Sequence, residues 1–139
     1  MLRMTERTTG AATSESCAYK YLRLSSDAAK EVRATVLGSA VANGYTTVNQ
    51  ADRLGKLLRV RPGSRLLDVG SGRGWPGGRI AERTGCDVVS ADLPLLALRD
   101  ARIHGARSEG ASAVVCADGR GLPFRDACFD AASHADVLC

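Results

Sequence analysis

The sequence predicts an α/β fold in which a doubly wound, mostly parallel sheet of about four strands follows two N-terminal helices. Short apolar runs alternate with helical patterns from residue 65 onward, and a glycine-rich loop breaks the chain directly after the first run. Strands that alternate with helices pair in parallel through right-handed crossovers. The alternation therefore predicts one open sheet.

Two helices are expected before the first strand. Apolar residues recur at helical spacing from Asp27 to about Asn43, and Gly44 is a natural stop. The pattern predicts one apolar face, formed by Ala29, Val32, Val36, Leu37, Ala40 and Val41. A second helix is expected from Gln50 to about Arg59, and its apolar side holds Leu54, Leu57 and Leu58.

The alternating part of the chain predicts four strands and two more helices. The expected strands are Arg65–Val69, Asp87–Ala91, Ser112–Cys116 and part of Phe129–Leu138, the last weakened by Ser133, His134 and Asp136. The expected helices are Pro76–Thr84 and Pro94 to about Ser108. Pro76 suits a first helical turn and Gly85 suits a helix end.

Composition separates a tail from a single domain. Residues 1–26 hold many small polar residues and few large apolar ones, so burial there cannot offset chain entropy and a disordered tail is expected. Residues 27–139 are long enough for one modest core. The net charge of +4 comes without a basic run that interleaves with aromatic residues. A solvated surface is therefore favoured over a nucleic-acid interface.

Cysteine usage favours a reducing compartment. The five cysteines are widely spaced and form no C-x-x-C pair, so neither a disulfide framework nor a zinc site is expected. No signal peptide is visible in Met1–Lys20, and the most apolar stretch, Ala34–Ala42, is too short to span a bilayer. We therefore expect a cytoplasmic protein without a bound metal.

The most informative stretch reads LLDVGSGRGWPGG, from Leu66 to Gly78. Glycines at 70, 72 and 74 let backbone amides approach a ligand, and the helix that follows offers unpaired N–H groups and a positive dipole end. This arrangement predicts a site for a nucleotide-like cofactor. The string from Gly72 to Gly77 also matches the dinucleotide fingerprint G-x-G-x-x-G, with Asp92 about where a ribose-binding acid should lie.

Four motifs together favour a different cofactor. The string D-V-G-S-G-R-G, from Asp68 to Gly74, resembles the first motif of the class I S-adenosylmethionine-dependent methyltransferases. The later strings VVSADLP and CADGRGLPF resemble further motifs of that family. The segment from Asp118 to Asp130 is similar to D-x-x-x-L-P-F-x-D-x-x-F-D, which is common in small-molecule methyltransferases of type 11. The resemblance covers about residues 49–139 and implies a Rossmann-like fold and S-adenosylmethionine as cofactor. A nicotinamide or flavin nucleotide stays the alternative.

The resemblance also implies roles for single residues. The backbone at Gly70, Gly72 and Gly74 would pass under the amino-acid and ribose portions of the cofactor. Asp68 would order this loop and reach the methionine ammonium, and the other reading of Asp68 is a capping carboxylate. Trp75 could close over the cofactor or pack on the sheet edge, and packing is favoured.

Three further positions complete the predicted cofactor site. Asp92 would accept hydrogen bonds from the ribose hydroxyls, and Leu93 would pack against the adenine ring. Asp118 and Gly119 would meet the polar edge of the adenine. For Asp118 a plain Asp-Gly turn is the alternative.

Methyl transfer from a sulfonium depends mainly on placing the acceptor in line with the methyl group. A general base is needed only if the acceptor must lose a proton. The available groups are His134, Asp136 and His104, and the sequence assigns none of them. The stretch from Ser133 to Asp136 lacks the Pro-Pro motif typical of methyltransferases that act on DNA bases. A small metabolite, lipid or quinone-like acceptor is expected instead.

The family's sheet has seven strands, whereas this sequence reaches about the fourth. A truncated domain is therefore expected, and the free edge of the fourth strand would invite self-association or a partner chain. Two alternatives to an active methyltransferase stay open. One is a non-catalytic or partner-dependent cofactor-binding module, and the other is an NAD(P)-binding oxidoreductase.

Overall fold

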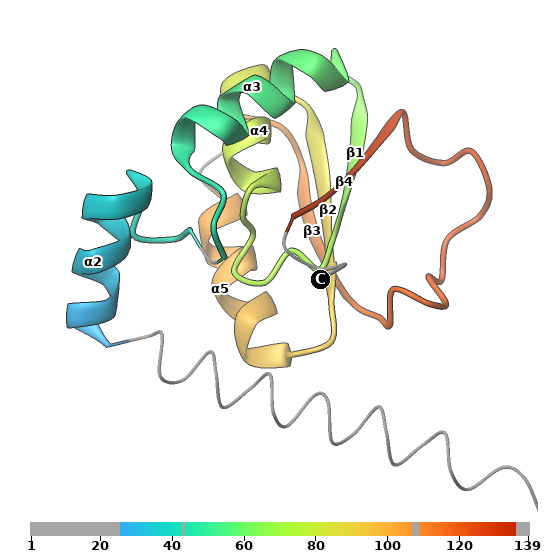
Figure 1. Cartoon of the computed structure of the whole chain (residues 1–139). Coiled ribbons are helices and arrows are strands. Elements are labelled where there is room, and N and C mark those ends of the chain that lie inside the picture. Colours follow the sequence, from blue (N-terminus) through green and yellow to red (C-terminus); the bar gives the residue numbers. More distant parts are fainter. Residues whose placement is uncertain (1–25, 43, 107–108, 136–139) are drawn as a thin grey trace, which may run out of the picture.

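The computed structural model describes residues 26–42, 44–106 and 109–135. In chain order it contains α2 (Asp27–Leu37), α3 (Val48–Leu58), β1 (Arg65–Val69), α4 (Gly77–Thr84), β2 (Asp87–Asp92), α5 (Leu95–Gly105), β3 (Ser112–Cys116) and β4 (Ala131–His134) (Figure 1). The predicted tail lies outside the described residues except for Ser26, and so do Asp136 and the last residues of the predicted fourth strand.

The four strands form one parallel sheet in the order β3-β2-β1-β4, which confirms the predicted α/β fold. Strand β1 is central, and Leu67 pairs with Val89 on one side and Ala132 on the other. Pairing on both sides buries the middle of β1. Because all strands run the same way, the segments that follow β1, β2 and β3 meet at one edge of the sheet.

Helices α4 and α5 pack against the sheet, α4 on β1 and β2 and α5 on β2 and β3. Helix α3 packs on α4 from outside, and Figure 1 shows these three helices on the same side of the sheet. Their shared core is made by Val60, Leu66, Ile80, Ala81, Cys86 and Val88. Each large member contributes roughly 1.5–3 kcal/mol through burial. This core carries the loop between β1 and α4.

Helix α2 differs from the prediction in length and in the face that it buries. It ends at Leu37 because Gly38 adopts φ 79° and donates its N–H to the carbonyl of Ala34. Val32 and Val36 of the predicted apolar face are 61% and 68% exposed, whereas Arg33 is buried. The Arg33 side chain turns inward because its Nε donates to the carbonyl of Ala40, 3.1 Å away.

Helix α3 begins two residues before the predicted start. Thr47 and Gln50 form a capping box, in which Thr47 N–H donates to Gln50 Oε1 at 2.8 Å and Gln50 N–H donates to Thr47 Oγ1 at 3.3 Å. Leu54 and Leu58 pack on the core as predicted. Leu57 is 69% exposed, so its predicted place on the apolar side was wrong.

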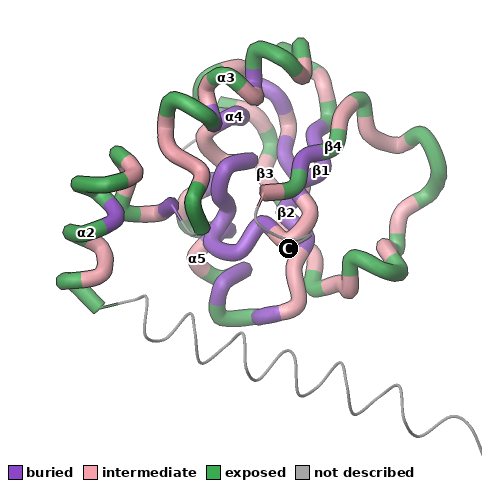
Figure 2. Tube along the Cα trace, viewed as in Figure 1, coloured by how far each residue is buried: buried purple, intermediate pink, exposed green. Residues whose placement is uncertain are grey.

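Strands β1 and β3 have the predicted bounds, and the other elements of the alternating part differ only at their ends. Gly85 closes α4 at φ 71°, as its position suggested. Buried residues gather along β1 and along residues 71–77, which form the glycine loop and the start of α4 (Figure 2). Among the described residues, no helix has the length and apolar character needed to cross a membrane, and no acidic, cysteine and histidine side chains cluster as metal ligands.

Candidate functional site

The glycine loop, residues 70–75, joins β1 to α4 and is tied to the neighbouring strand. The N–H groups of Gly70 and Ser71 both donate to the carbonyl of Ala91 on β2, at 2.8 and 3.3 Å. Gly70, Gly72 and Gly74 adopt φ values of 66°, 53° and 87°. These left-handed conformations favour glycine, because a side chain would be strained there. The spacing of the glycines therefore follows from the path of the backbone.

Asp68 lies beneath this loop, fully buried on β1. Its Oδ2 accepts a hydrogen bond from Gly77 N–H at 2.9 Å, and its Oδ1 accepts one from Ser133 Oγ at 2.8 Å. The first bond places a carboxylate at the start of α4, where the helix dipole favours negative charge. This is the geometry of the capping alternative. The contact of Asp68 with a methionine ammonium stays a prediction.

Burial also changes the acidity of Asp68. Loss of water raises the pKa of this carboxyl from 3.8 to about 6, although the hydrogen bonds from Ser133 and Gly77 lower it in part. The nearby charge of Asp92 raises the pKa further. Ionised Asp68 is therefore held in the fold at a cost in stability.

Asp92 ends β2 at the carboxyl edge of the sheet and holds the glycine loop. Its Oδ2 accepts from Gly72 N–H at 2.7 Å, and its Oδ1 accepts from Leu93 N–H at 2.7 Å. Burial raises the pKa of the Asp92 carboxyl, and these two backbone bonds oppose the shift. The carboxylate is therefore fixed in place next to the loop, with Leu93 beside it.

Asp118 and Gly119 follow β3 at the same edge. The N–H of Ala117 donates to the carbonyl of Asp92 at 3.0 Å, which places this segment next to the end of β2. A Cβ built on Gly119 would lie 3.4 Å from the side chain of Val69, so Gly119 lies by the end of β1. The structure thus brings the predicted positions after β1, β2 and β3 together.

The carboxylate of Asp118 is engaged by its own loop. Arg120 donates to both of its oxygens, with Nε 3.0 Å from Oδ1 and Nη2 2.6 Å from Oδ2. This ion pair, with a bond from the backbone N–H of Arg120, lowers the pKa of Asp118 to about 2. Gly121 N–H donates to the carbonyl of Asp118 at 2.9 Å, which is the turn given as the alternative. Sequence reasoning missed Arg120, although its position two residues after Asp118 was a visible signal.

The candidate bases lie in different places. His134 ends β4 at the carboxyl edge and is exposed, in register with Val69. His104 is half-buried on α5, with Nδ1 3.3 Å from the carbonyl oxygen of Arg73. Asp136 lies outside the described residues. The geometry assigns no catalytic base.

Trp75 packs as favoured, but in the interior beside α3 and the segment before it, and not on the sheet edge. It is 3% exposed and lies in a cluster with Ala42 and Ala51. Its indole Nε1 donates to the carbonyl of Thr46 at 2.9 Å. The indole therefore anchors the segment before α3 to the glycine loop.

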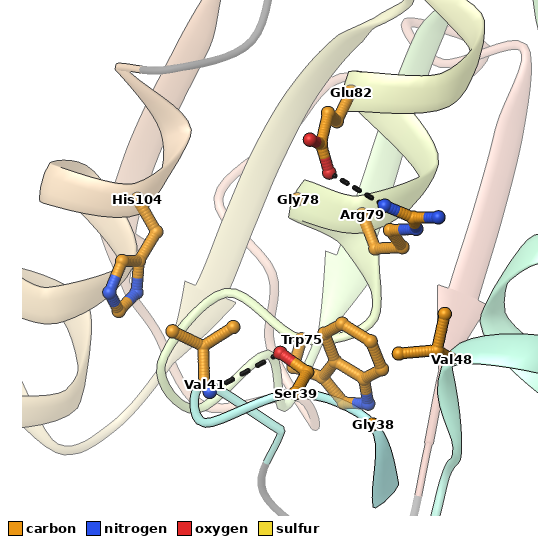
Figure 3. A pocket seen from close by; sticks show the side chains of 9 residues that line it. All are labelled: Gly38, Ser39, Val41, Val48, Trp75, Gly78, Arg79, Glu82 and His104. Carbon is orange, nitrogen blue, oxygen red and sulfur yellow. Dashed lines mark hydrogen bonds and ion pairs between the residues drawn. The ribbon is translucent and has the colours of Figure 1, made fainter. Parts of the chain in front are cut away.

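A separate pocket of about 410 Å³ lies on the helix side of the loop (Figure 3). It is bounded by α4, α5 and the segment between α2 and α3, and its lining residues are Gly38, Ser39, Val41, Val48, Trp75, Gly78, Arg79, Glu82 and His104. No residue of the predicted cofactor site lines this pocket.

Known proteins resemble this chain in sequence. The family model described as "Methyltransferase domain" matches residues 67–139. The chain is 37% identical over 90 residues to the 24-methylenesterol C-methyltransferase 2 of Oryza sativa subsp. japonica, covering 63% of this chain and 25% of the relative. It is 34% identical over 89 residues to the squalene methyltransferase 1 of Botryococcus braunii, covering 63% and 24%. The chain thus spans about a quarter of the length of these curated relatives.

Solved structures share the fold. A SAM-dependent methyltransferase from Thiobacillus denitrificans, in complex with S-adenosyl-L-homocysteine, superposes with a TM-score of 0.61 at 23% identity, covering 76% of this chain and 43% of that one. The [4+2]-cyclase SpnF superposes with a TM-score of 0.51 at 28% identity, covering 66% and 36%. The second of these proteins is named a cyclase, so the fold by itself does not define one reaction.

Proposed function

This chain belongs to the class I S-adenosylmethionine-dependent methyltransferases, and we propose that its glycine-loop edge binds S-adenosylmethionine for methyl transfer to a lipid-like acceptor. The observation that carries the proposal is the Asp92 carboxylate, fixed at 2.7 Å on Gly72 N–H where β1 and β2 end together. Each of its oxygens accepts one backbone hydrogen bond and would keep a further lone pair for a hydroxyl of a ribose diol. Gly70 and Gly72 keep the neighbouring backbone free of side chains.

We propose that the residues after β3 bind the adenine end of the same ligand. Asp118 would accept from the exocyclic amine, and the backbone N–H of Gly119 would serve a ring nitrogen. Leu93 directly follows Asp92, and its carbonyl accepts from Cys116 Sγ at the end of β3 at 3.2 Å. Its side chain would pack against the ring. Asp68 would act from beneath, by holding the start of α4 in place, with its contact to the methionine ammonium as a further part of the proposal.

An apolar acceptor is proposed because the curated relatives are named for sterols and squalene. When bound, the cofactor would supply the methyl group: the acceptor's electron pair would bond to the methyl carbon as the carbon–sulfur bond breaks, and an alkene acceptor would then lose a proton to water. The leaving group is already activated, so alignment of the two reactants supplies most of the acceleration. Methyl transfer by this chain, its cytoplasmic location and a partner along β4, an edge strand of the described sheet, are parts of this proposal.

Titration calorimetry with S-adenosylmethionine, with NAD as the comparison ligand, tests the cofactor. We expect saturable binding of S-adenosylmethionine alone, and about 10- to 100-fold weaker binding by Asp92→Asn, because bonds to a charged acceptor contribute roughly 1.5–3 kcal/mol. Asp126→Asn is the matched control, since Asp126 is an exposed carboxyl in the segment between β3 and β4. Equal affinities of the two variants would contradict the assigned role of Asp92. Binding of NAD alone would favour the oxidoreductase alternative.

The Arg120 ion pair leads to a second prediction. Because Arg120 occupies both oxygens of Asp118, an adenine amine must displace this guanidinium or share the carboxylate with it. Arg120→Gln should therefore tighten S-adenosylmethionine binding by about threefold, a small effect because exposed ion pairs are weak. Asp118→Asn should weaken binding, and Arg125→Gln, which removes an exposed charge five residues away, should leave it unchanged. Weaker binding by Arg120→Gln would mean that this arginine contacts the ligand itself.

A further inference from the structure

Helices α3 and α4 lie side by side (Figure 1), and a second pocket, of about 300 Å³, lies in the groove between them. The helices approach closely at Gly55, where an added Cβ would lie 3.4 Å from Cγ2 of Ile80. The lining residues Ala51, Val60 and Ile80 are buried and apolar. The inner wall of this pocket, which we call the α3–α4 pocket, is therefore apolar.

Three cations line the same pocket. Lys56 and Arg59 come from the end of α3, Arg83 comes from the last turn of α4, and all three residues are exposed. Within residues 26–42, 44–106 and 109–135, their side chains form no ion pair and donate no hydrogen bond. Like charges around one cavity repel one another, so an anion bound among them would relieve that repulsion.

The carboxylate that lines the pocket, Asp52, is already engaged. Arg79 donates to both of its oxygens, with Nε 2.8 Å from Oδ1 and Nη2 3.1 Å from Oδ2. This bonding lowers the pKa of Asp52 most, and the charges of Arg83 and Lys56 lower it further, although burial opposes the shift. Asp52 is therefore ionised and held by Arg79, and the lining side chains carry a net charge of +2.

The backbone of Arg59 is unusual for the residue that it carries. Arg59 ends α3 at φ 54° and ψ 26°, a left-handed conformation that is costly for a residue with a side chain. Helices α2 and α4 end in the same conformation with glycines, Gly38 and Gly85. The long side chain of Arg59 is therefore not required by the helix end, and its place at the pocket indicates a role there.

The cationic side of the pocket lies away from the proposed cofactor site. Helix α4 begins after the glycine loop at the carboxyl edge of the sheet and ends at Thr84, just before β2 begins. A Cβ on Gly85 would lie 3.1 Å from Cγ of Pro62, which lies between α3 and β1. The last turns of α3 and α4 thus meet near the amino edge, and a ligand there would leave the carboxyl edge free.

We propose that Lys56, Arg59 and Arg83 form a binding site for a phosphate group in the α3–α4 pocket. A phosphate monoester carries a charge of about −1.5 to −2 at neutral pH, which matches the net charge of the lining. The two guanidinium groups offer paired donors to its oxygens, and the lysine adds a point charge. The apolar inner wall would receive the carbon portion of such a molecule. The site does not depend on S-adenosylmethionine binding.

Titration calorimetry of the full chain with inorganic phosphate, at constant ionic strength and without cofactor, tests the site. We expect saturable binding with a Kd of about 1 mM. Lys56→Gln and Arg83→Gln should each weaken it about fivefold, because each removes one charged donor from a site that solvent partly screens. Arg53→Gln is the matched control, since Arg53 is exposed on α3 but does not line the pocket, and it should bind phosphate like the wild type.

Arg59→Gly separates binding from a structural role of this residue. Glycine adopts the left-handed conformation without strain, so the variant should raise the Tm in phosphate-free buffer by about 3 °C. It should also weaken phosphate binding about fivefold, since the guanidinium is lost. A lower Tm with unchanged phosphate affinity would mean that Arg59 serves only the end of α3, and would contradict its place in the site.

The phosphate group could belong to a lipid headgroup or to a soluble molecule. Sedimentation with phosphatidylcholine vesicles, with and without phosphatidic acid, distinguishes these sources. Binding only to vesicles with phosphatidic acid, lost in Lys56→Gln and kept in Arg53→Gln, would identify a lipid headgroup. Calorimetric binding of phosphate without binding to either vesicle would identify a soluble phosphorylated molecule.

Two results would overturn the site. One is the absence of saturable phosphate binding by the wild type. The other is an equal loss of phosphate affinity in Arg53→Gln and Lys56→Gln, which would show a general attraction of anions to positive charge on α3 and not a site in the pocket. Circular dichroism of each variant ensures that the compared proteins are folded.

Discussion

Between pH 4 and pH 7 the carboxyl of Asp68 should remove up to about 3 kcal/mol from the free energy of unfolding, and Asp68→Asn should abolish this loss. The folded-state pKa of about 6 lies above the ordinary value of 3.8, so the folded protein binds this proton more tightly than the unfolded chain. Its contribution is therefore complete below about pH 4 and is lost as the pH rises through 6. A shift of roughly two pKa units corresponds to about 3 kcal/mol.

Denaturant unfolding at a series of pH values measures this effect as the difference between wild type and variant. An asparagine side chain has nearly the same shape, and it can accept from Gly77 N–H while its amide donates to Ser133 Oγ. Asp126→Asn, at an exposed carboxyl, should follow the wild type. Ser133→Ala removes a bond that lowers the pKa of Asp68, so its loss of stability should extend to higher pH. If the free energy of unfolding changed with pH equally in the wild type and Asp68→Asn, the predicted effect of Asp68 would be contradicted.

Gly77→Ala should cost about 3 kcal/mol of stability, whereas Gly78→Ala should leave it unchanged or raise it by up to about 1 kcal/mol. A Cβ on Gly77 would lie 2.6 Å from Oδ2 and 2.7 Å from Cβ of Asp68. The fully buried Asp68 has no room to move, and its displacement would break the bonds at the start of α4. A Cβ on Gly78 meets nothing within 4 Å, and alanine is the better helix former.

The two glycines are neighbours in one helix, so the change in helix propensity from glycine to alanine is nearly the same in both variants and cancels in the comparison. Unfolding of both variants by denaturant, with circular dichroism to follow the helices, gives the difference directly. Similar stabilities would mean that α4 does not approach β1 as closely as the contact with Asp68 requires. A selective loss in Gly77→Ala would establish the contact that positions the glycine loop.

Much of the sheet could be predicted because its signals are local. Strands β1 and β3 are short apolar runs with clear breaks on both sides, and the structure has them at the predicted bounds. Asp92 was predicted at the end of the second strand, and parallel pairing of β2 with β1 brings it next to the glycine loop. The capping box of Thr47 and Gln50 was also visible as a spacing, although only Gln50 entered the prediction.

The predictions were wrong where the spacing of apolar residues was compatible with burial of either of two helix faces. Helical spacing in α2 is compatible with burial of Val32 and Val36 or of the neighbouring stripe that holds Arg33. The contact with the Ala40 carbonyl, formed only after the chain turns back at Gly38, selects the second. Similarly, Leu57 and Leu58 are both apolar neighbours, and only the direction of α4 decides that Leu58 packs inward.

The sequence by itself determined the order of strands and helices along the chain, the glycine loop, and the carboxylates within β1, at the end of β2 and after β3, because each depends on neighbours within a few residues. Only the tertiary structure decided which of those groups already have hydrogen-bond partners within the protein. Asp68 accepts a hydrogen bond from Ser133, 65 residues away on β4, and Arg33 donates to the Ala40 carbonyl beyond the end of α2. Such pairings depend on which surfaces pack together, and desolvation there sets the charges that the site presents.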